Sequence, residues 1–270
     1  MSESNCTENS GCSVLVLGLG YVANSLISQS SAKFRVTSRR GSAAGTGTHE
    51  QPLYFSLTDP DSWSVVDPFD HIVWTFPAAQ NESEVKFAVE FFESKCLPEK
   101  KVLVLASTSA YRVGTAGALV DEDFPLDLLQ PRVRAEEQLR SRGACILHLA
   151  GIYGPGRDPV SWLQRGLIKS PDAFINLIHA SDICRIILGW LDSNGFKFRR
   201  FNASDGRMRT WQQLIDELKS AGLLDQSFEL PSDSQSPLKV SSKRVNHEAL
   251  VHELYAGPFH CYPEDGLELV

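Results

Sequence analysis

Two close glycines follow a short apolar run and give the strongest chemical signal in the sequence. The run Val14-Leu15-Val16-Leu17 leads into Gly18 and Gly20, and Ala23 follows where a helix would begin. Gly18 can take a tight turn, Gly20 has no side chain to hold a phosphate away, and Ala23 lets the helix lie against the strand. The N–H groups and positive end of that helix suit a diphosphate. The pattern predicts a dinucleotide cradle, with a simple turn as the alternative.

A basic cluster stands where the second strand would end. Residues 34–38 read as that strand, and Ser38, Arg39 and Arg40 close it without an acidic residue nearby. An acidic residue at this place binds the ribose 2′-hydroxyl of NAD, whereas a guanidinium group matches the 2′-phosphate of NADP in geometry and charge. We therefore expect NADP as the cofactor, with NAD possible. A solvated basic turn is the alternative.

Polar and aromatic residues follow two further predicted strands. The fourth strand, 70–75, ends in Thr75-Phe76-Pro77, and the fifth, 101–106, opens into Ser107-Thr108-Ser109-Ala110-Tyr111. The carboxyl ends of parallel strands line the ligand crevice of an open α/β sheet. We therefore expect Thr75, Phe76 and Pro77 to face the same dinucleotide.

Strand-like and helix-like segments alternate over the first 150 residues. Parallel strands need crossover connections, so this alternation predicts an α/β fold with a Rossmann-type doubly wound parallel sheet. The expected strands are 14–17, 34–38, 52–57, 70–75, 101–106 and 145–150, and the expected helices are 21–31, 60–65, one starting near 81, and 131–142.

The composition shifts to turns after residue 150. We expect a nucleotide-binding domain at 13–150 and mainly a small substrate-binding lobe at 151–270, after a flexible tail at 1–12. In the lobe, the sequence predicts strands at 175–179 and 198–203, a helix capped by Ser181, a helix opened by the capping box Thr210-x-x-Gln213, and a last helix at 243–254. Residues 41–47 and 226–237 read as loops.

Composition excludes several classes of protein. The 270 residues carry a formal net charge of −7 and no long Lys/Arg block, which argues against nucleic acid or a membrane as the partner. The histidines show no metal-binding spacing, so no metal is expected. No signal peptide or membrane-length apolar stretch is visible, and we expect a cytoplasmic location. The cysteines lack C-x-x-C spacing and read as reduced, mostly buried thiols: Cys6, Cys12, Cys96, Cys145, Cys184 and Cys261.

Several short motifs occur in an order typical of one enzyme family. They are Gly18-Leu19-Gly20-Tyr21, Ser107-Thr108-Ser109-Ala110-Tyr111, Asp121-Glu122, Pro131-Arg132-Val133-Arg134, Leu149-Ala150-Gly151-Ile152-Tyr153-Gly154-Pro155-Gly156-Arg157, Asn176-Leu177-Ile178-His179, Asn202-Ala203-Ser204-Asp205-Gly206 and Ser242-Lys243-Arg244-Val245. In series, from about residue 14 to 266, they resemble the extended, epimerase/dehydratase-type short-chain dehydrogenase/reductases. The Pro-Arg-x-Arg motif resembles an atypical branch of that family.

The resemblance implies NAD(P) bound across the strand ends and a Ser or Thr, a Tyr and a Lys that handle the substrate proton. Ser107 takes the Ser/Thr position and Arg134 that of the lysine, whereas Gln130 falls on the tyrosine. A phenol donates a proton near neutral pH only beside a cation, and an arginine does not shuttle protons. Tyr111 or Tyr153 is therefore the candidate replacement, with packing of each ring under the nicotinamide or the substrate loop as the alternative.

The resemblance also extends the list of expected contacts. With the cradle and the basic cluster, the implied cofactor contacts are Tyr21, Val22, Ser107, Arg134, Ala150, Gly151 and Ile152. The implied substrate contacts are Ser109, Tyr153, Arg157, Asn176 and His179, with turn or cap roles as the alternative for some. His148 lies in an apolar strand and is expected to be a core histidine.

Two kinds of function fit these residues. One is an NADP-dependent oxidoreductase or epimerase acting on a small hydroxylated substrate, with a monomer or a homodimer as the alternatives for its assembly. The other is an NAD(P)-binding sensor or scaffold that lacks turnover because the Tyr-x-x-x-Lys pair is missing. A purely structural protein would not need the two glycines.

Overall fold

A seven-stranded parallel sheet forms the centre of the fold. The computed structural model describes residues 14–30, 34–40, 51–168, 170–230 and 242–264. The strand order is β11-β7-β5-β4-β1-β2-β3, and all neighbours are parallel. The strands are β1 (Val14–Leu17), β2 (Phe34–Ser38), β3 (Leu53–Tyr54), β4 (His71–Trp74), β5 (Lys101–Ser107), β7 (Cys145–Leu149) and β11 (Arg200–Ala203). The order reverses between β1 and β4, where ligands bind in such sheets.

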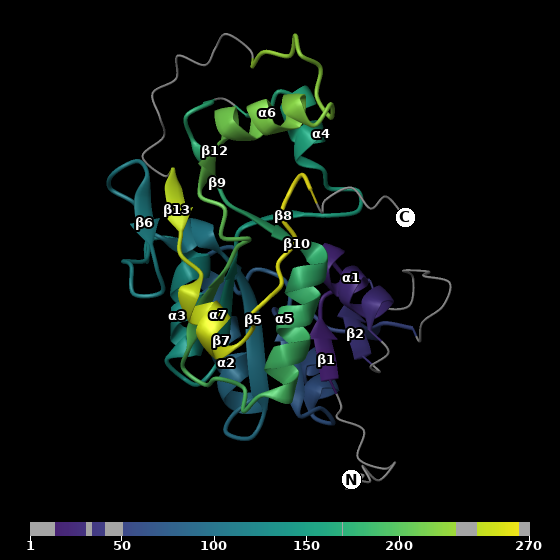
Figure 1. The fold of residues 1–270 in the computed structure, drawn as a ribbon. Coiled ribbons are helices and arrows are strands. Elements are labelled where there is room, and N and C mark those ends of the chain that lie inside the picture. Colours follow the sequence, from purple (N-terminus) through teal and green to yellow (C-terminus); the bar gives the residue numbers. More distant parts are fainter. Residues whose placement is uncertain (1–13, 31–33, 41–50, 169, 231–241, 265–270) are drawn as a thin grey trace, which may run out of the picture.

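Helices cover both faces of the sheet (Figure 1). Helices α1 (Tyr21–Gln29) and α5 (Ala180–Asp192) pack together on one face, and α2 (Glu82–Lys95), α3 (Pro131–Arg140) and the 3-10 helix η2 (Pro60–Val66) cover the other. Strand β1 shows why both faces need cover, because Val14 and Val16 point into one core and Leu15 and Leu17 into the other. A central strand buried on both faces has this continuous apolar character.

Shorter elements stand at one end of the sheet, where Figure 1 shows α4 and α6 above the strands. Three two-stranded pairs join them. The pairs are β8 (Gly151–Tyr153) with β10 (Leu177–His179), β9 (Phe174–Ile175) with β12 (Arg209–Thr210), and β6 (Ala118–Val120) with β13 (Lys243–Val245). The remaining helices are η3 (Thr108–Ala110), α4 (Pro159–Gln164), α6 (Trp211–Ser220) and α7 (Glu248–Glu253). A separate apolar core fills this part of the chain.

The structure confirms the predicted Rossmann-type α/β class and most of the predicted elements. The capping box of α6 at Thr210 and Gln213 is present in full. His148 is buried, as expected of a core histidine, and the free thiols of Cys96, Cys145 and Cys184 are buried as well. Among the described residues, no helix is both long enough and apolar enough to cross a membrane.

Some predicted elements are wrong in extent or type. The last helix was expected over 243–254, but residues 243–245 form strand β13 and only Glu248–Glu253 is helical. The cap of α5 is His179, whose Nδ1 accepts from the Ser181 amide at 3.2 Å, so Ser181 is not the cap. The third strand covers only Leu53–Tyr54, and α1 ends at Gln29. The strand expected at 198–203 begins at Arg200.

The chain returns to the central sheet after residue 150, since α5 packs on α1 and β11 pairs with β7. The predicted division at that residue stays a prediction. The expected tail at 1–12, the loop at 41–47, Cys6 and Cys12 lie outside the described residues, as does 231–237 of the loop expected at 226–237.

Candidate functional site

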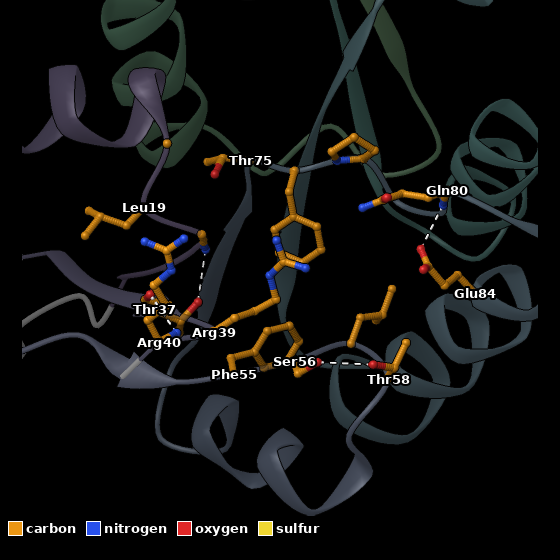
Figure 2. Close-up of a pocket in the computed structure, with 16 residues that line it drawn as sticks. Leu19, Thr37, Arg39, Arg40, Phe55, Ser56, Thr58, Thr75, Gln80 and Glu84 are labelled. Atoms are coloured by element: carbon orange, nitrogen blue, oxygen red, sulfur yellow. Dashed lines mark hydrogen bonds between the residues drawn. The ribbon is translucent and has the colours of Figure 1, made fainter. Parts of the chain in front are cut away.

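A cavity of about 690 Å³ opens at the carboxyl ends of β1, β2 and β4. Figure 2 shows its lining side chains, which come from the β1–α1 turn, the end of β2, the segment after β3 and the segment after β4. The lining residues are Gly18, Leu19, Gly20, Thr37, Ser38, Arg39, Arg40, Phe55, Ser56, Leu57, Thr58, Thr75, Phe76, Pro77, Gln80 and Glu84. The predicted residues of the cradle, the basic cluster and the fourth strand thus share one cavity.

The turn after β1 is held from two neighbouring strands. The Gly18 amide donates to Thr37 Oγ1 at 3.0 Å, and Thr75 Oγ1 donates to the Leu17 carbonyl at 2.9 Å. Gly18 has a φ of +96°, and a Cβ there would lie 2.9 Å from Thr75 Oγ1. Glycine is therefore required by the backbone and by the closeness of β4.

Gly20 faces open space: apart from its own chain neighbours, no atom of the described residues lies within 4 Å of the place where its Cβ would stand. It is the cap residue of α1 but offers no side chain to the helix amides, and the first turn contains no acidic residue. The amides that follow Gly20, from Tyr21 and Val22 on, therefore have no capping side chain, while the Val22 side chain is buried in the core. A dinucleotide diphosphate fits this bare helix end, and the absent Cβ lets it approach.

Arg39 and Arg40 extend from the end of β2 into the cavity (Figure 2). Neither guanidinium group has a carboxylate partner within the described parts of the chain. Ser38 fixes the turn that presents them, because its Oγ accepts from the Arg40 amide at 3.1 Å. The Glu84 carboxylate on the far wall instead accepts from the Gln80 amide at 2.8 Å. Both guanidinium groups can therefore donate hydrogen bonds to a phosphate group of a ligand that enters the cavity.

Two serines follow β5 and form a chain of hydrogen bonds with α3. Ser107 Oγ accepts from the Ser109 amide at 3.2 Å and from Ser109 Oγ at 3.1 Å. Ser109 Oγ in turn accepts from Arg132 Nη2 at 3.1 Å. Arg132 Nη1 donates to both carboxylate oxygens of Glu136, at 2.9 and 3.1 Å. Because Ser107 Oγ accepts two hydrogen bonds, the hydroxyl proton of Ser107 can be donated to a ligand.

Arg134 lies apart from this chain. It pairs with Glu82 at the start of α2 and donates to the Leu128 carbonyl at 2.9 Å. Gln130, at the tyrosine position, donates to Asp127 at 2.8 Å. The cation that reaches the two serines is Arg132, whose role the sequence did not single out.

Tyr111 points into the protein rather than into the crevice. Its hydroxyl donates to Asn202 Oδ1 at 2.6 Å and lies 3.1 Å from His148 Nδ1. Burial is the main reason that the pKa of the Tyr111 phenol is raised, and burial also lowers the pKa of His148 to about 3. Both side chains therefore stay neutral near pH 7, and the Tyr111 proton is held inside the structure.

Three of the residues expected to contact the substrate make contacts with other parts of the chain: Tyr153, Asn176 and His179. Tyr153 is buried and its hydroxyl donates to the His260 carbonyl at 2.9 Å. Asn176 uses both ends of its amide on β13, donating to the Lys243 carbonyl and accepting from the Val245 amide, each at 2.9 Å. The buried ring of His179 lies against the His260 ring, with 4.5 Å between centroids.

The other expected contacts follow β7, and one of them, Arg157, touches the first residue of α1. Ala150 is buried, Gly151 is exposed, and Ile152 is partly buried in β8. Arg157 is exposed and stacks on the Tyr21 ring, with its Cζ 4.7 Å from the ring centroid.

Sequence reasoning missed part of the cavity wall and the Arg132–Glu136 pair. The rule that strand ends face the crevice could have named Phe55 and Thr58, which follow β3. Glu136 is four residues after Arg132, a spacing that permits a helical ion pair. Its burial, with 2% of the residue exposed, depends on helix packing that the sequence does not display.

The chain is similar to known proteins in sequence and in fold. Protein YeeZ of Escherichia coli K12 is 26% identical over 192 residues, which cover 63% of this chain and 69% of YeeZ. No family model matches the chain. MoeE5, solved with UDP-glucuronic acid and NAD, superposes with a TM-score of 0.70 at 15% identity, covering 94% of this chain and 96% of MoeE5. RMD of Pseudomonas aeruginosa, solved with NADPH, superposes with a TM-score of 0.64 at 14% identity, covering 94% of this chain and 94% of RMD.

The expected resemblance to the extended short-chain dehydrogenase/reductases is confirmed. Other solved epimerases and dehydratases share the fold. In this shared fold, the cavity beside Gly20 lies at the strand ends where the sheet order reverses.

Proposed function

We propose that this protein binds a nicotinamide dinucleotide, NADP(H) in preference to NAD(H), and acts as an oxidoreductase or epimerase on a small hydroxylated substrate. The observation that carries the proposal is the open space beside Gly20, at a helix end without a cap and within a 690 Å³ cavity. MoeE5 with NAD and RMD with NADPH, which share the fold, support a nicotinamide cofactor.

The cavity offers a different kind of contact to each part of the cofactor. The α1 amides suit the diphosphate, and Arg39 and Arg40 suit a 2′-phosphate. Phe55 and Leu57 supply apolar wall for an adenine ring. Figure 2 shows the two arginines and Phe55 on the same side of the space.

When bound, the nicotinamide would supply or accept a hydride. Ser107 would then hold the substrate oxygen, because its hydroxyl proton is the one that the Ser109 and Arg132 contacts leave free. Arg132 acts as a positioning residue through Ser109, and Glu136 fixes Arg132. Arg134, which lies between α2 and α3, would contribute only its positive charge to the site.

A second candidate function is nucleotide sensing without turnover. The favouring observation is that Tyr111 is buried while Gln130 and Arg134 occupy the places of the family tyrosine and lysine. Ser107→Ala separates the two functions once a substrate is found, because it should slow turnover in an enzyme. Tight NADPH binding without turnover of any substrate class would favour the sensor.

Titration of nicotinamide fluorescence tests the proposal. We expect the wild type to bind NADPH more tightly than NADH. The double change Arg39→Ala and Arg40→Ala should weaken NADPH about tenfold or more and leave NADH nearly unchanged, because only NADPH carries the 2′-phosphate. Arg165→Ala, at an exposed arginine after α4, is the control. Failure of the wild type to bind either nucleotide would refute the function, and equal losses would refute the NADP preference.

A further inference from the structure

The turn between β8 and α4 is fastened to the first residue of α1. Tyr21 is that residue, and its hydroxyl donates to the Pro155 carbonyl at 3.0 Å. Gly154 has a φ of +141°, and a Cβ there would come within 2.9 Å of the Tyr21 hydroxyl. The turn closes on itself through the Gly154 amide to the Arg157 carbonyl at 3.1 Å, and the reverse bond at 2.8 Å. A side chain at residue 154 would push the turn away, so the sequence is fitted to this contact.

Arg157 ends the turn over the Tyr21 ring. Its Cζ lies 4.7 Å from the ring centroid, within the range of a cation–π contact. Side chains of a helix lean toward its N-terminus. The Tyr21 ring therefore holds the guanidinium group beside the same uncapped helix end that Gly20 leaves open.

This arrangement brings two positive features together. The N-terminus of α1 carries a partial positive charge, and its first turn has no acidic residue. Arg157 has no carboxylate partner in the ranges that the structure describes, although the whole chain has a net charge of −7. A cation near a helix N-terminus is repelled by the positive end of the helix dipole, whereas an anion bound between the two would attract both.

We propose that Arg157, stacked on Tyr21 just outside the lining of the cavity beside Gly20, is a clasp that binds the diphosphate of the dinucleotide together with the α1 amides. The inference rests on the proposed cofactor and adds to it a binding residue in the C-terminal half of the chain. A diphosphate also occurs in sugar-nucleotide substrates. We assign the clasp to the cofactor because Tyr21 directly follows Gly20 of the cradle.

The test compares Arg157→Ala, Arg157→Lys and the control Arg165→Ala by calorimetric titration. We expect Arg157→Ala to bind NADPH about 10- to 100-fold more weakly than the wild type. 2′-Phospho-ADP-ribose, which keeps the diphosphate, should lose as much, and adenosine 2′,5′-bisphosphate, which has a single 5′-phosphate, should lose less. Arg157→Lys should fall between, since lysine keeps the charge but not the planar stack. Arg165→Ala should bind like the wild type.

Two results would overturn the clasp while leaving the proposed function intact. One is unchanged NADPH affinity in Arg157→Ala. The other is a loss confined to UDP-glucose, titrated into the NADPH-loaded protein, which would assign Arg157 to a substrate diphosphate. A wild type that binds no NADPH is a different result, because it refutes the proposed function itself.

Discussion

Tyr111, His148 and Asn202 form a hydrogen-bonded group behind the sheet edge. Asn202 Oδ1 accepts the Tyr111 proton, so His148 Nδ1 must donate to the phenol oxygen in the neutral ring. Asn202 also donates from its backbone amide to Glu122 at 2.8 Å and from its side chain to the Asn246 carbonyl at 3.1 Å. The Tyr111 hydroxyl, the His148 Nδ1–H, and the backbone and side-chain amides of Asn202 each donate to an acceptor inside the protein. The group therefore ties Tyr111, which follows β5, to the paired strands β7 and β11.

Burial of His148 makes stability depend on pH. Burial lowers its folded-state pKa from 6.5 to about 3, so between these values the unfolded chain binds a proton that the folded chain does not. The His148 side chain therefore lowers the free energy of unfolding as the pH falls from about 6.5 toward 3, by at most about 1.4 kcal/mol per pH unit. We expect His148→Gln to be less stable than the wild type at pH 7, with a gap that narrows as the pH falls.

Urea unfolding between pH 4.5 and 7.5 measures that gap. His252→Gln is the control, because His252 is an exposed histidine of α7. If the difference in unfolding free energy between His148→Gln and the wild type stays constant across this range, His148 binds a proton as readily in the folded protein as in the unfolded chain.

At the level of elements, the β1–α1 turn assigns different tasks to its two glycines. Gly18→Ala forces a left-handed backbone on a residue with a Cβ and brings that atom against Thr75. We expect a loss of about 1–3 kcal/mol in the free energy of unfolding. Gly20→Ala meets no protein atom and has an extended backbone, with φ −97° and ψ −170°, so its stability should change little.

Nucleotide binding should separate the same two variants. Gly20→Ala places a methyl group in the space reserved for the diphosphate, and we expect a loss in NADPH affinity of about tenfold or more. Thermal unfolding with and without NADPH reads both effects in one experiment. If Gly20→Ala were stabilised by NADPH as much as the wild type, the cradle would not hold the diphosphate.

The turn was predictable because its signals are local, whereas other features depend on distant contacts. The glycines and the apolar run sit within ten residues, and short-range geometry fixes what they can do. Strand β13 instead exists because Lys243–Val245 pairs with Ala118–Val120, far away in sequence, and a helical pattern was predicted there. Likewise, the Pro-Arg-x-Arg motif identifies two arginines, but only the packing of α3 sends Arg132 to Ser109 and Arg134 to Glu82.

For the whole molecule, the last described residues tie the C-terminal elements to the central sheet. Figure 1 shows this segment rising from α7 toward β8 and α4. The His260 amide donates to Asp182 of α5 at 2.8 Å, and the Tyr262 hydroxyl donates to Asp158, the cap of α4, at 2.5 Å. The Tyr262 carbonyl accepts from Arg209 at 2.6 Å. One short segment therefore connects a sheet-covering helix with two elements of the smaller core.

Tyr262→Ala should loosen that connection. The side chain is 1% exposed and packs edge-on against Tyr153, with 5.3 Å between ring centroids. Its removal leaves a cavity in the smaller core, and we expect a loss of about 3–5 kcal/mol in stability, against about 1–2 kcal/mol for Tyr262→Phe, which loses only the bond to Asp158. Hydrogen exchange should rise in β8, α4 and the first turn of α5 while β1 and β4 stay protected. Faster exchange confined to residues 258–264 would mean that the segment is attached to the fold without joining its parts.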